Sequence, residues 1–81
     1  MEIKILGPGC PKCKQLDRLV RMVVEENSID AEVTKVEDIV EIMNAGIMIT
    51  PALMINGKVV HKGSVPSKDE IKKKIEENIN G

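Results

Sequence analysis

Two residues of this sequence have the type and spacing to do chemistry: Cys10 and Cys13, which are separated by Pro11 and Lys12. Residues three positions apart at the start of a helix are neighbours, within the Cα distance that a disulfide accepts. A disulfide that closes so small a loop removes little entropy from the unfolded chain, so it would stabilise the fold only weakly. The pair therefore indicates reactive thiols, which either exchange disulfides or bind a soft metal ion.

The two cysteines are not equivalent in the sequence. Cys10 is expected at the tip of a helix, where free N–H groups and the helix dipole stabilise a thiolate. Lys12 and Lys14 add positive charge that lowers the thiolate pKa, and Pro11 is a further influence on it. Cys13 continues the apolar stripe of the helix and is expected to face inward. This asymmetry predicts that Cys10 attacks the substrate disulfide and that Cys13 resolves the mixed disulfide.

Hydrophobic spacing and turn residues outline the elements that must position this pair. Apolar residues alternate in the expected strands and recur every three or four residues in the expected helices. Asn56-Gly57 is a strong hairpin signal, and Ser67 with Glu70 forms a capping box before a last helix. The first predicted elements are a strand at 2–6, a helix from Pro11 to about Asn27 and a strand at 31–36. A short helix follows Glu37-Asp38, beginning at Ile39 and ending before Gly46. The hairpin strands at 52–55 and 58–61 and the last helix complete the set.

This order, β-α-β-α-β-β-α, predicts an α/β fold in a single domain over residues 1–81. A strand–helix–strand unit requires parallel strands joined by a right-handed crossover, and the hairpin adds an antiparallel pair. We therefore expect a mixed four-stranded sheet flanked by three helices.

The core must be aliphatic, because the sequence contains no Phe, Tyr or Trp. The buried stripe expected on the last helix is Ile71, Ile75 and Ile79. Three methionines match no metal-ligand spacing and are expected to pack in the core or near the reactive pair: Met43, Met48 and Met54. Alternatively, Met48 and Ile49 would form an apolar rim near Pro51 where a partner docks.

Length and composition exclude several classes of function. The chain has 81 residues and a formal net charge of −1, so nothing draws it to nucleic acid or to an anionic membrane. Its N-terminus lacks the features of a secretion signal, and its most apolar segment, 47–55, is too short to span a bilayer. We therefore expect a cytoplasmic protein, in a compartment where structural disulfides are rare.

Four features together resemble the thioredoxin–glutaredoxin superfamily over essentially the whole chain: the first strand, the Cys-Pro-Lys-Cys motif at a helix start, Thr50-Pro51 before a hairpin, and the final helix. The sequence is most similar to the small single-domain members known as redox-active disulfide proteins. This resemblance implies a thioredoxin-like fold, a cis Thr50–Pro51 peptide bond, and substrate binding by these two residues. It also implies a thiol–disulfide oxidoreductase without an organic cofactor, because the electrons reside on the two sulfurs.

Departures from the family pattern limit the expected partners. Thioredoxins carry Trp before the first cysteine, where this chain has Gly9. Glutaredoxins hold glutathione with a Gly-Gly and acidic segment, which the stretch 62–67 matches weakly. The expected substrate is therefore a disulfide-containing protein rather than glutathione. We expect a monomer that acts as a reductant and is recycled by a thioredoxin-reductase-type electron donor.

Soft-metal binding is the alternative that the sequence leaves open, since two thiolates suit Cu(I) or Zn(II). Heavy-metal-binding domains also place a CxxC motif after a first strand, but they end in strand, helix, strand, whereas this chain ends in a hairpin and a helix. A four-ligand zinc site also lacks ligands, because the only histidine, His61, is expected on the surface of the hairpin. Metal delivery, or a cluster that bridges two subunits, stays possible.

Overall fold

The computed structural model describes residues 1–79, and its elements follow the predicted order. Their bounds differ from the predicted ones by no more than one residue, and residues 80 and 81 of the predicted domain lie outside the described residues. The elements are β1 (Glu2–Leu6), α1 (Pro11–Glu26), β2 (Glu32–Val36), α2 (Ile39–Asn44), β3 (Ala52–Ile55), β4 (Lys58–Lys62) and α3 (Lys68–Ile79).

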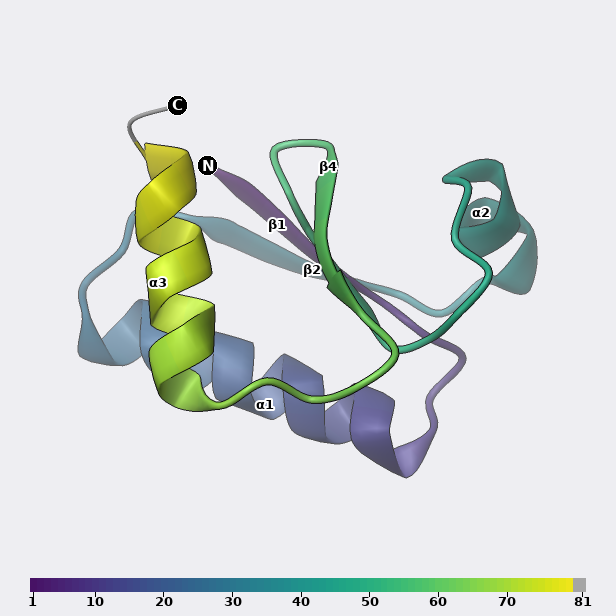
Figure 1. Cartoon of the computed structure of the whole chain (residues 1–81), viewed down its shortest axis with the longest axis horizontal. Helices are drawn as coiled ribbons and strands as arrows, with labels where there is room; N and C mark the ends of the chain where they lie inside the picture. Colours follow the sequence, from purple (N-terminus) through teal and green to yellow (C-terminus); the bar gives the residue numbers. More distant parts are fainter. Residues whose placement is uncertain (80–81) are drawn as a thin grey trace.

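The four strands form one mixed sheet in the order β2-β1-β3-β4. In Figure 1 the strands lie between α2 on one side and α1 and α3 on the other. β1 pairs in parallel with β2 and antiparallel with β3, and β3 and β4 form the antiparallel hairpin. Leu6, the last residue of β1, therefore lies between Val36, the last of β2, and Ala52, the first of β3. The segments that follow β1 and β2 and the segment that precedes β3 consequently meet at one edge of the sheet. The predicted mixed sheet is confirmed.

Alternation along the strands divides the core between the two faces of the sheet. The larger cluster packs α1 and α3 against one face, and the smaller one packs α2 and the residues after it against the other. The larger cluster is Ile3, Ile5, Leu16, Val20, Val23, Leu53, Ile55, Ile71 and Ile75. The smaller cluster is Leu6, Ile42, Ile47 and Ala52. The core is aliphatic, as predicted, and the smaller cluster lies at the sheet edge where β1 ends.

Local turn chemistry explains where the hairpin and α3 begin. Asn56 and Gly57 both have positive φ, at 51° and 80°, as the tightest hairpin turn requires. The Asn56 side chain also accepts a hydrogen bond from the N–H of Glu2 at 2.9 Å, which ties the turn to β1. At the start of α3 the hydroxyl of Ser67 accepts from the N–H of Glu70 at 3.2 Å. The hairpin signal is therefore realised in the structure, and so is the hydrogen bond of the capping box that Ser67 accepts.

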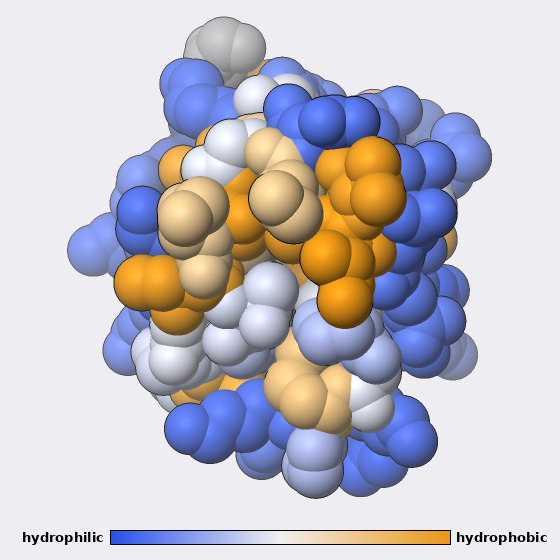
Figure 2. All heavy atoms as spheres, turned by 90° about the vertical axis from the view of Figure 1, so that its right-hand side faces the viewer, coloured by the Kyte–Doolittle hydropathy of each residue, from blue (hydrophilic) through white to orange (hydrophobic). Residues whose placement is uncertain are grey.

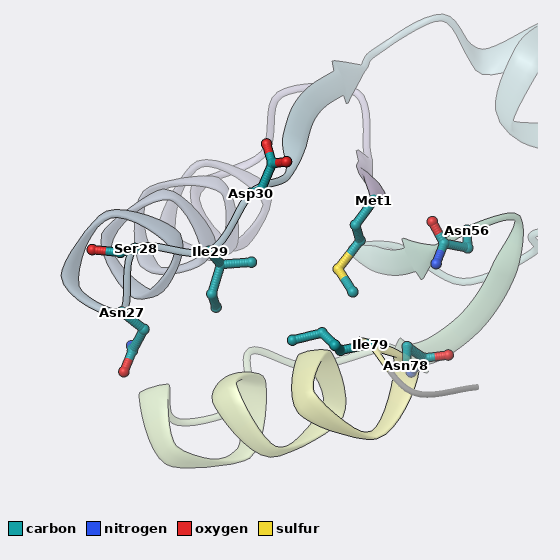
Figure 3. A pocket seen from close by; sticks show the side chains of 8 residues that line it. All are labelled: Met1, Asn27, Ser28, Ile29, Asp30, Asn56, Asn78 and Ile79. Atoms are coloured by element: carbon teal, nitrogen blue, oxygen red, sulfur yellow. The ribbon is translucent and has the colours of Figure 1, made fainter.

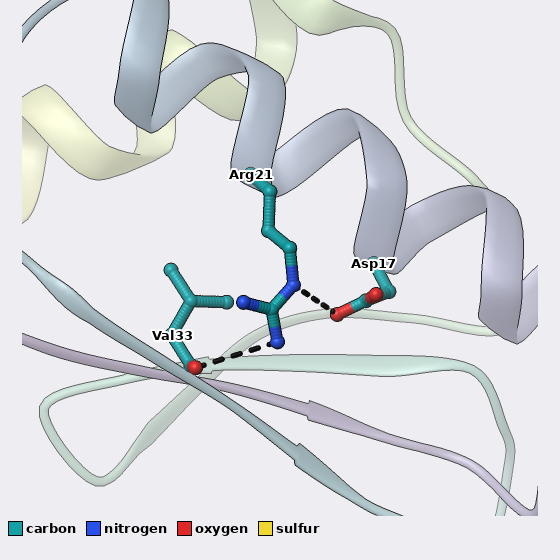
Figure 4. A network of polar contacts seen from close by, with 3 residues as sticks. All are labelled: Asp17, Arg21 and Val33. Atoms are coloured by element: carbon teal, nitrogen blue, oxygen red, sulfur yellow. Dashed lines mark hydrogen bonds and ion pairs between the residues drawn. The ribbon is translucent and has the colours of Figure 1, made fainter.

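An arginine on α1 reaches the edge strand β2 (Figure 4). The guanidinium of Arg21 donates to the carboxylate of Asp17 at 3.0 Å and to the carbonyl oxygen of Val33 at 3.5 Å. These contacts are exposed, so they orient the helix over β2 more than they stabilise it. Within residues 1–79 no helix is long and apolar enough to cross a membrane.

The stripe predicted for α3 is only partly correct. Ile71 and Ile75 are fully buried, but Ile79 is 53% exposed. The reason is that the last turn of α3 passes beyond the packed core and borders an open cavity, where Ile79 faces Met1 and Ile29 (Figure 3).

Candidate active site

β1 and α1 hold the two cysteines at the sheet edge. The N–H of Gly7 donates to the carbonyl of Val36 at 2.9 Å, so the pairing of β1 with β2 continues one residue beyond the strand. The chain then turns through Pro8 and Gly9 into α1. Pro11 occupies the first turn of the helix, where N–H groups have no partner within the helix, so its lack of an N–H costs no hydrogen bond.

Cys10 is the N-cap of α1. Its backbone is extended, with φ −68° and ψ 163°, and its sulfur accepts a hydrogen bond from the N–H of Cys13 at 3.2 Å. A thiol sulfur here takes the place that a serine or aspartate oxygen usually takes at a helix start. An N–H donor and the positive end of the helix both favour a negatively charged sulfur.

Cys10 and Cys13 form a disulfide, with their Cα atoms 5.0 Å apart. Cys13 is 2% exposed and lies with the buried face of α1, whereas Cys10 is half-buried at the helix tip. The structure therefore confirms the predicted asymmetry, since Cys13 is buried and Cys10 is the more exposed residue of the two.

Gly7 packs between the disulfide and the Thr50–Pro51 segment. A Cβ at Gly7 would collide with the Sγ of Cys13, and its position lies 3.9 Å from the Cα of Pro51. The Thr50–Pro51 peptide bond is cis, as the family resemblance implied. Pro51 is buried, Thr50 is half-buried, and the carbonyl of Pro51 accepts from the N–H of Gly63 at 2.9 Å. The structure thus brings Thr50 and Pro51 to the cysteine pair, on the side of Cys13.

The two lysines near the motif are solvent-exposed. Lys12 and Lys14 lie at the start of α1, and neither forms an ion pair among residues 1–79. Water and salt weaken the attraction between exposed charges and a thiolate, so any effect of these lysines depends on ionic strength.

A carboxylate that sequence analysis assigned only to a helix start also lies at the site. The Glu37 Oε2 atom is 3.0 Å from the position that a Cβ of Gly9 would occupy, next to Cys10. The N-cap of α2 is instead Asp38, whose carboxylate accepts from the N–H groups of Val40 and Glu41 at 2.8 and 3.4 Å. The signal that could have located Glu37 is its position directly after β2, since parallel neighbours end at the same sheet edge.

The methionines are placed differently from the first expectation. Met43 and Met48 are largely exposed, at 63% and 89%, so packing in the core is wrong for both. The reason is that α2 has only six residues and buries a single side chain, Ile42. Both methionines line a groove with Pro8 and Thr50, which agrees with the other expected place, near the reactive pair. Met54 is partly buried against the smaller core cluster. The alternative, an apolar rim of Met48 and Ile49 near Pro51, agrees with the exposure of both side chains.

Metal binding is not favoured. Among residues 1–79 no group of three or more His, Cys, Asp or Glu side chains could hold a metal ion. His61 lies on the hairpin, and its Nε2 is 2.9 Å from the hydroxyl of Ser64, within hydrogen-bond distance. The two sulfurs are bonded to each other.

A cavity of about 520 Å³ lies at the other end of β1 and α1 (Figure 3). Its three asparagines already bond to the backbone: Asn27 to the carbonyl of Val23, Asn78 to that of Lys74, and Asn56 to the N–H of Glu2. None of its lining residues is a cysteine or a histidine. This cavity therefore offers no chemistry to compete with the cysteine pair.

A disulfide between a half-buried cysteine at a helix start and a buried cysteine one turn later, with a cis-proline segment packed nearby on a mixed sheet, defines a thiol–disulfide oxidoreductase of the thioredoxin-like class. The family described as "Thioredoxin domain" matches residues 1–76. A thioredoxin of Methanocaldococcus jannaschii is 40% identical over 79 residues, which cover 98% of this chain and 91% of the relative. A thioredoxin of Methanothermobacter thermautotrophicus is 41% identical over 73 residues, which cover 90% and 95%. The chain belongs to the thioredoxin domain family, and its function is thiol–disulfide oxidoreduction.

Proposed function

We propose that the chain is a single-domain, monomeric, cytoplasmic reductant of protein disulfides, with Cys10 as the nucleophile and Cys13 as the resolving thiol. The observation that supports this assignment most is the unequal exposure of the pair, since Cys13 is 2% exposed and Cys10 is only half-buried. The attacking sulfur must meet a disulfide on another protein, whereas the resolving sulfur needs to reach only Cys10.

The exchange takes place in two steps. The Cys10 thiolate attacks one sulfur of the substrate disulfide, the substrate S–S bond breaks, and the other sulfur leaves as a thiolate that takes up a proton. Cys13 then loses its proton and attacks the Cys10 sulfur, which releases the second substrate thiol and leaves the Cys10–Cys13 disulfide. The substrate gains two electrons and two protons, and an electron donor of the thioredoxin-reductase type returns the same number to the protein.

The residues around the pair assist these steps. The backbone of Thr50, beside buried Pro51, orients the substrate segment next to the sulfurs. Lys12 and Lys14 favour the thiolate of Cys10 by their positive charge, and Pro11 starts the helix whose dipole does the same. The weak match of residues 62–67 to the glutathione-binding pattern supports a protein substrate rather than glutathione.

Single serine variants test the roles of the two cysteines. Cys13→Ser and Cys10→Ser are reduced, freed of reductant and mixed with a disulfide-bonded test protein such as insulin. Cys13→Ser is expected to accumulate a covalent mixed disulfide, because nothing resolves the adduct at Cys10. Cys10→Ser is expected to form none. Mass spectrometry under non-reducing conditions measures both adducts.

The wild type serves as the control for the reaction itself. With dithiothreitol as the recycling reductant, it should reduce insulin, and both serine variants should be inactive. Equal trapping by the two variants would overturn the assignment of roles, and an inactive wild type would overturn the proposed reductase function.

A further inference from the structure

The carboxylate of Glu37 lies beside Cys10 without a charged partner of its own. Its Oε2 atom is 3.0 Å from the position that a Cβ of Gly9 would take, and Gly9 directly precedes Cys10. Because neighbouring Cα atoms are about 3.8 Å apart, the carboxylate lies within about 8 Å of the Cα of Cys10. Among residues 1–79, Glu37 forms no ion pair. Its negative charge is therefore free to act on the thiol next to it.

The surface on this side of the molecule supplies no countercharge. From Val36 to Gly57 the chain contains no Lys, Arg or His. Figure 2 views the side where α2 lies in Figure 1, and apolar side chains gather there. Five large apolar residues of this segment are more than half exposed: Ile39, Val40, Met43, Met48 and Ile49. The segment that begins α2 thus adds negative charge beside the site and no positive charge.

Two other carboxylates near the start of α2 are placed differently. Asp38 accepts hydrogen bonds from the N–H groups of Val40 and Glu41, so its charge is directed at the helix start. Glu41 lines a separate hollow together with Lys4 and Met54, on the sheet face that α2 covers only in part. Glu37 is therefore the carboxylate of this segment that approaches the residue before Cys10.

Cations on the neighbouring elements oppose this carboxylate. Lys12 and Lys14 at the start of α1 are exposed and favour a thiolate. The other basic residues on the strands that meet at the site are Lys35 on β2 and His61 and Lys62 on β4. All of these groups stay in place when residue 37 alone is changed. The contribution of Glu37 can therefore be measured as a difference between two proteins.

We propose that Glu37 acts through Cys10: its charge disfavours the Cys10 thiolate and thereby makes the reduced protein a stronger electron donor. The inference rests on the proposed function, because it takes Cys10 as the nucleophile and the protein as a reductant. A negative charge beside a thiol favours the protonated form, whereas the disulfide has no charge to repel. Stabilising the reduced form of such a protein makes its disulfide a strong oxidant. Opposing the thiolate has the reverse effect, since it favours release of the two electrons to a substrate.

The effect is confined to a defined range of pH. Above the pKa of the Cys10 thiol the reduced protein carries a thiolate, which Glu37 destabilises relative to the disulfide. Below that pKa the thiol is neutral, and Glu37 favours neither redox state. Glu37→Gln is therefore expected to lower the pKa of the Cys10 thiol, by increasing its acid dissociation constant about threefold to tenfold. The redox equilibrium should change by the same factor above the pKa and stay unchanged below it.

Titration of the reduced protein tests the first expectation. The thiolate absorbs in the ultraviolet, where this chain has no Tyr or Trp to obscure it. Glu37→Lys reverses the charge and should lower the pKa of the Cys10 thiol further than Glu37→Gln does. Glu37→Asp keeps the charge and should stay closer to the wild type. Glu41→Gln is the matched control, because it removes the same charge from α2 away from Gly9, and should leave the pKa unchanged.

Competition for electrons between two proteins tests the second expectation. Reduced Glu37→Gln is mixed with an equal amount of oxidised, isotopically labelled wild type, and a trace of dithiothreitol carries the exchange. Each wild-type disulfide that is reduced takes two electrons and the accompanying protons from one variant molecule, which becomes a disulfide. Acid quenching, alkylation and mass spectrometry then give the equilibrium constant. Above the pKa the variant should retain the electrons by about threefold to tenfold, and below it the constant should be close to 1.

Three outcomes would overturn the proposal: an unchanged pKa in Glu37→Gln and Glu37→Lys, a pKa that Glu41→Gln lowers as much, or a redox difference that persists below the pKa. The last result would indicate a structural effect of the substitution rather than an effect of charge. Reduction of insulin separates this inference from the proposed function. If the wild type reduces insulin while Glu37→Gln keeps the wild-type pKa and redox equilibrium, the inference alone fails. If the wild type does not reduce insulin, the proposed function fails, whatever the titration shows.

Discussion

Gly7 leaves space for the disulfide because it has no side chain. The position that its Cβ would take is occupied by the Sγ of Cys13, and no positive φ explains the residue. Gly57 is the opposite case, because its φ is +80° and a Cβ there would meet no atom within 4 Å. One glycine therefore provides space for the disulfide, and the other provides a backbone conformation.

Gly7→Ala is expected to lower the free energy of unfolding of the oxidised protein by about 1–3 kcal/mol, the usual cost of overpacking. In the reduced protein the cost should be smaller, because the Cys13 sulfur is free to rotate away. Urea unfolding followed by circular dichroism, with and without dithiothreitol, measures both values. Gly57→Ala is the control and should cost the same in both redox states, since its penalty lies in the backbone. Equal costs for Gly7→Ala would contradict the steric explanation.

The residues of the site differ in how far sequence can predict them. Cys10 and Cys13 are recognised from local spacing, and Thr50-Pro51 from the resemblance to a family. Gly7 is not recognised, because the collision of its Cβ with the Cys13 sulfur depends on the folded geometry and not on residue type or spacing. Glu37 could have been located only from its position directly after β2. The exposure of Met43 could not be predicted, since an apolar residue in a short helix is normally buried, whereas the exposure of Met48 agrees with the predicted apolar rim.

Elements with strong local signals were predicted to within a residue. β1 and the first strand of the hairpin have the predicted bounds, and the capping hydroxyl of Ser67 and the turn at Asn56-Gly57 take the expected conformations. The burial of side chains in the last turn of α3 was predicted less well. The spacing of Ile71, Ile75 and Ile79 shows that they share a helix face, but it does not show where the underlying core ends.

Two substitutions on α3 measure where its packing ends. Ile75→Ala is expected to lower the free energy of unfolding by about 2–5 kcal/mol, because the side chain is fully buried in the larger core cluster. Ile79→Ala removes the same atoms one turn later from a side chain that is 53% exposed, and should cost under about 1 kcal/mol. Urea midpoints of the two variants give the comparison, and similar costs would mean that the cavity beside Ile79 closes in solution.

The topology of the whole molecule assembles the site from four parts of the chain. Because β1 and β2 run in parallel and β3 returns beside β1, residues 7–10, Glu37 and Thr50-Pro51 meet at one sheet edge. Gly63, which follows β4, joins them through its bond to Pro51. The order β-α-β-α-β-β-α predicted these connections, but the strand order β2-β1-β3-β4, which determines what lies beside the cysteines, is a tertiary property.

The disulfide contributes little to the stability of the whole molecule. It joins residues only three apart, so the chain-entropy estimate of its stabilisation is at most about 2 kcal/mol. Reduction should therefore lower the free energy of unfolding by about that amount or less, and the reduced protein should stay folded. The chain has no Tyr or Trp, so unfolding by urea is followed by far-ultraviolet circular dichroism rather than by fluorescence. A decrease in the free energy of unfolding of more than about 4 kcal/mol would mean that the disulfide has a structural role.

The hydrogen bond from the Cys13 N–H to the Cys10 sulfur has a consequence for the helix as well as for the thiol. The atom that reacts is also the atom that closes the first turn of α1. Each covalent change at Cys10, from thiolate to mixed disulfide to internal disulfide, therefore changes the acceptor of a backbone amide. We therefore expect the redox state of Cys10 to affect how readily the first turn of α1 frays, and the Cys13 amide proton to report this change in an NMR spectrum.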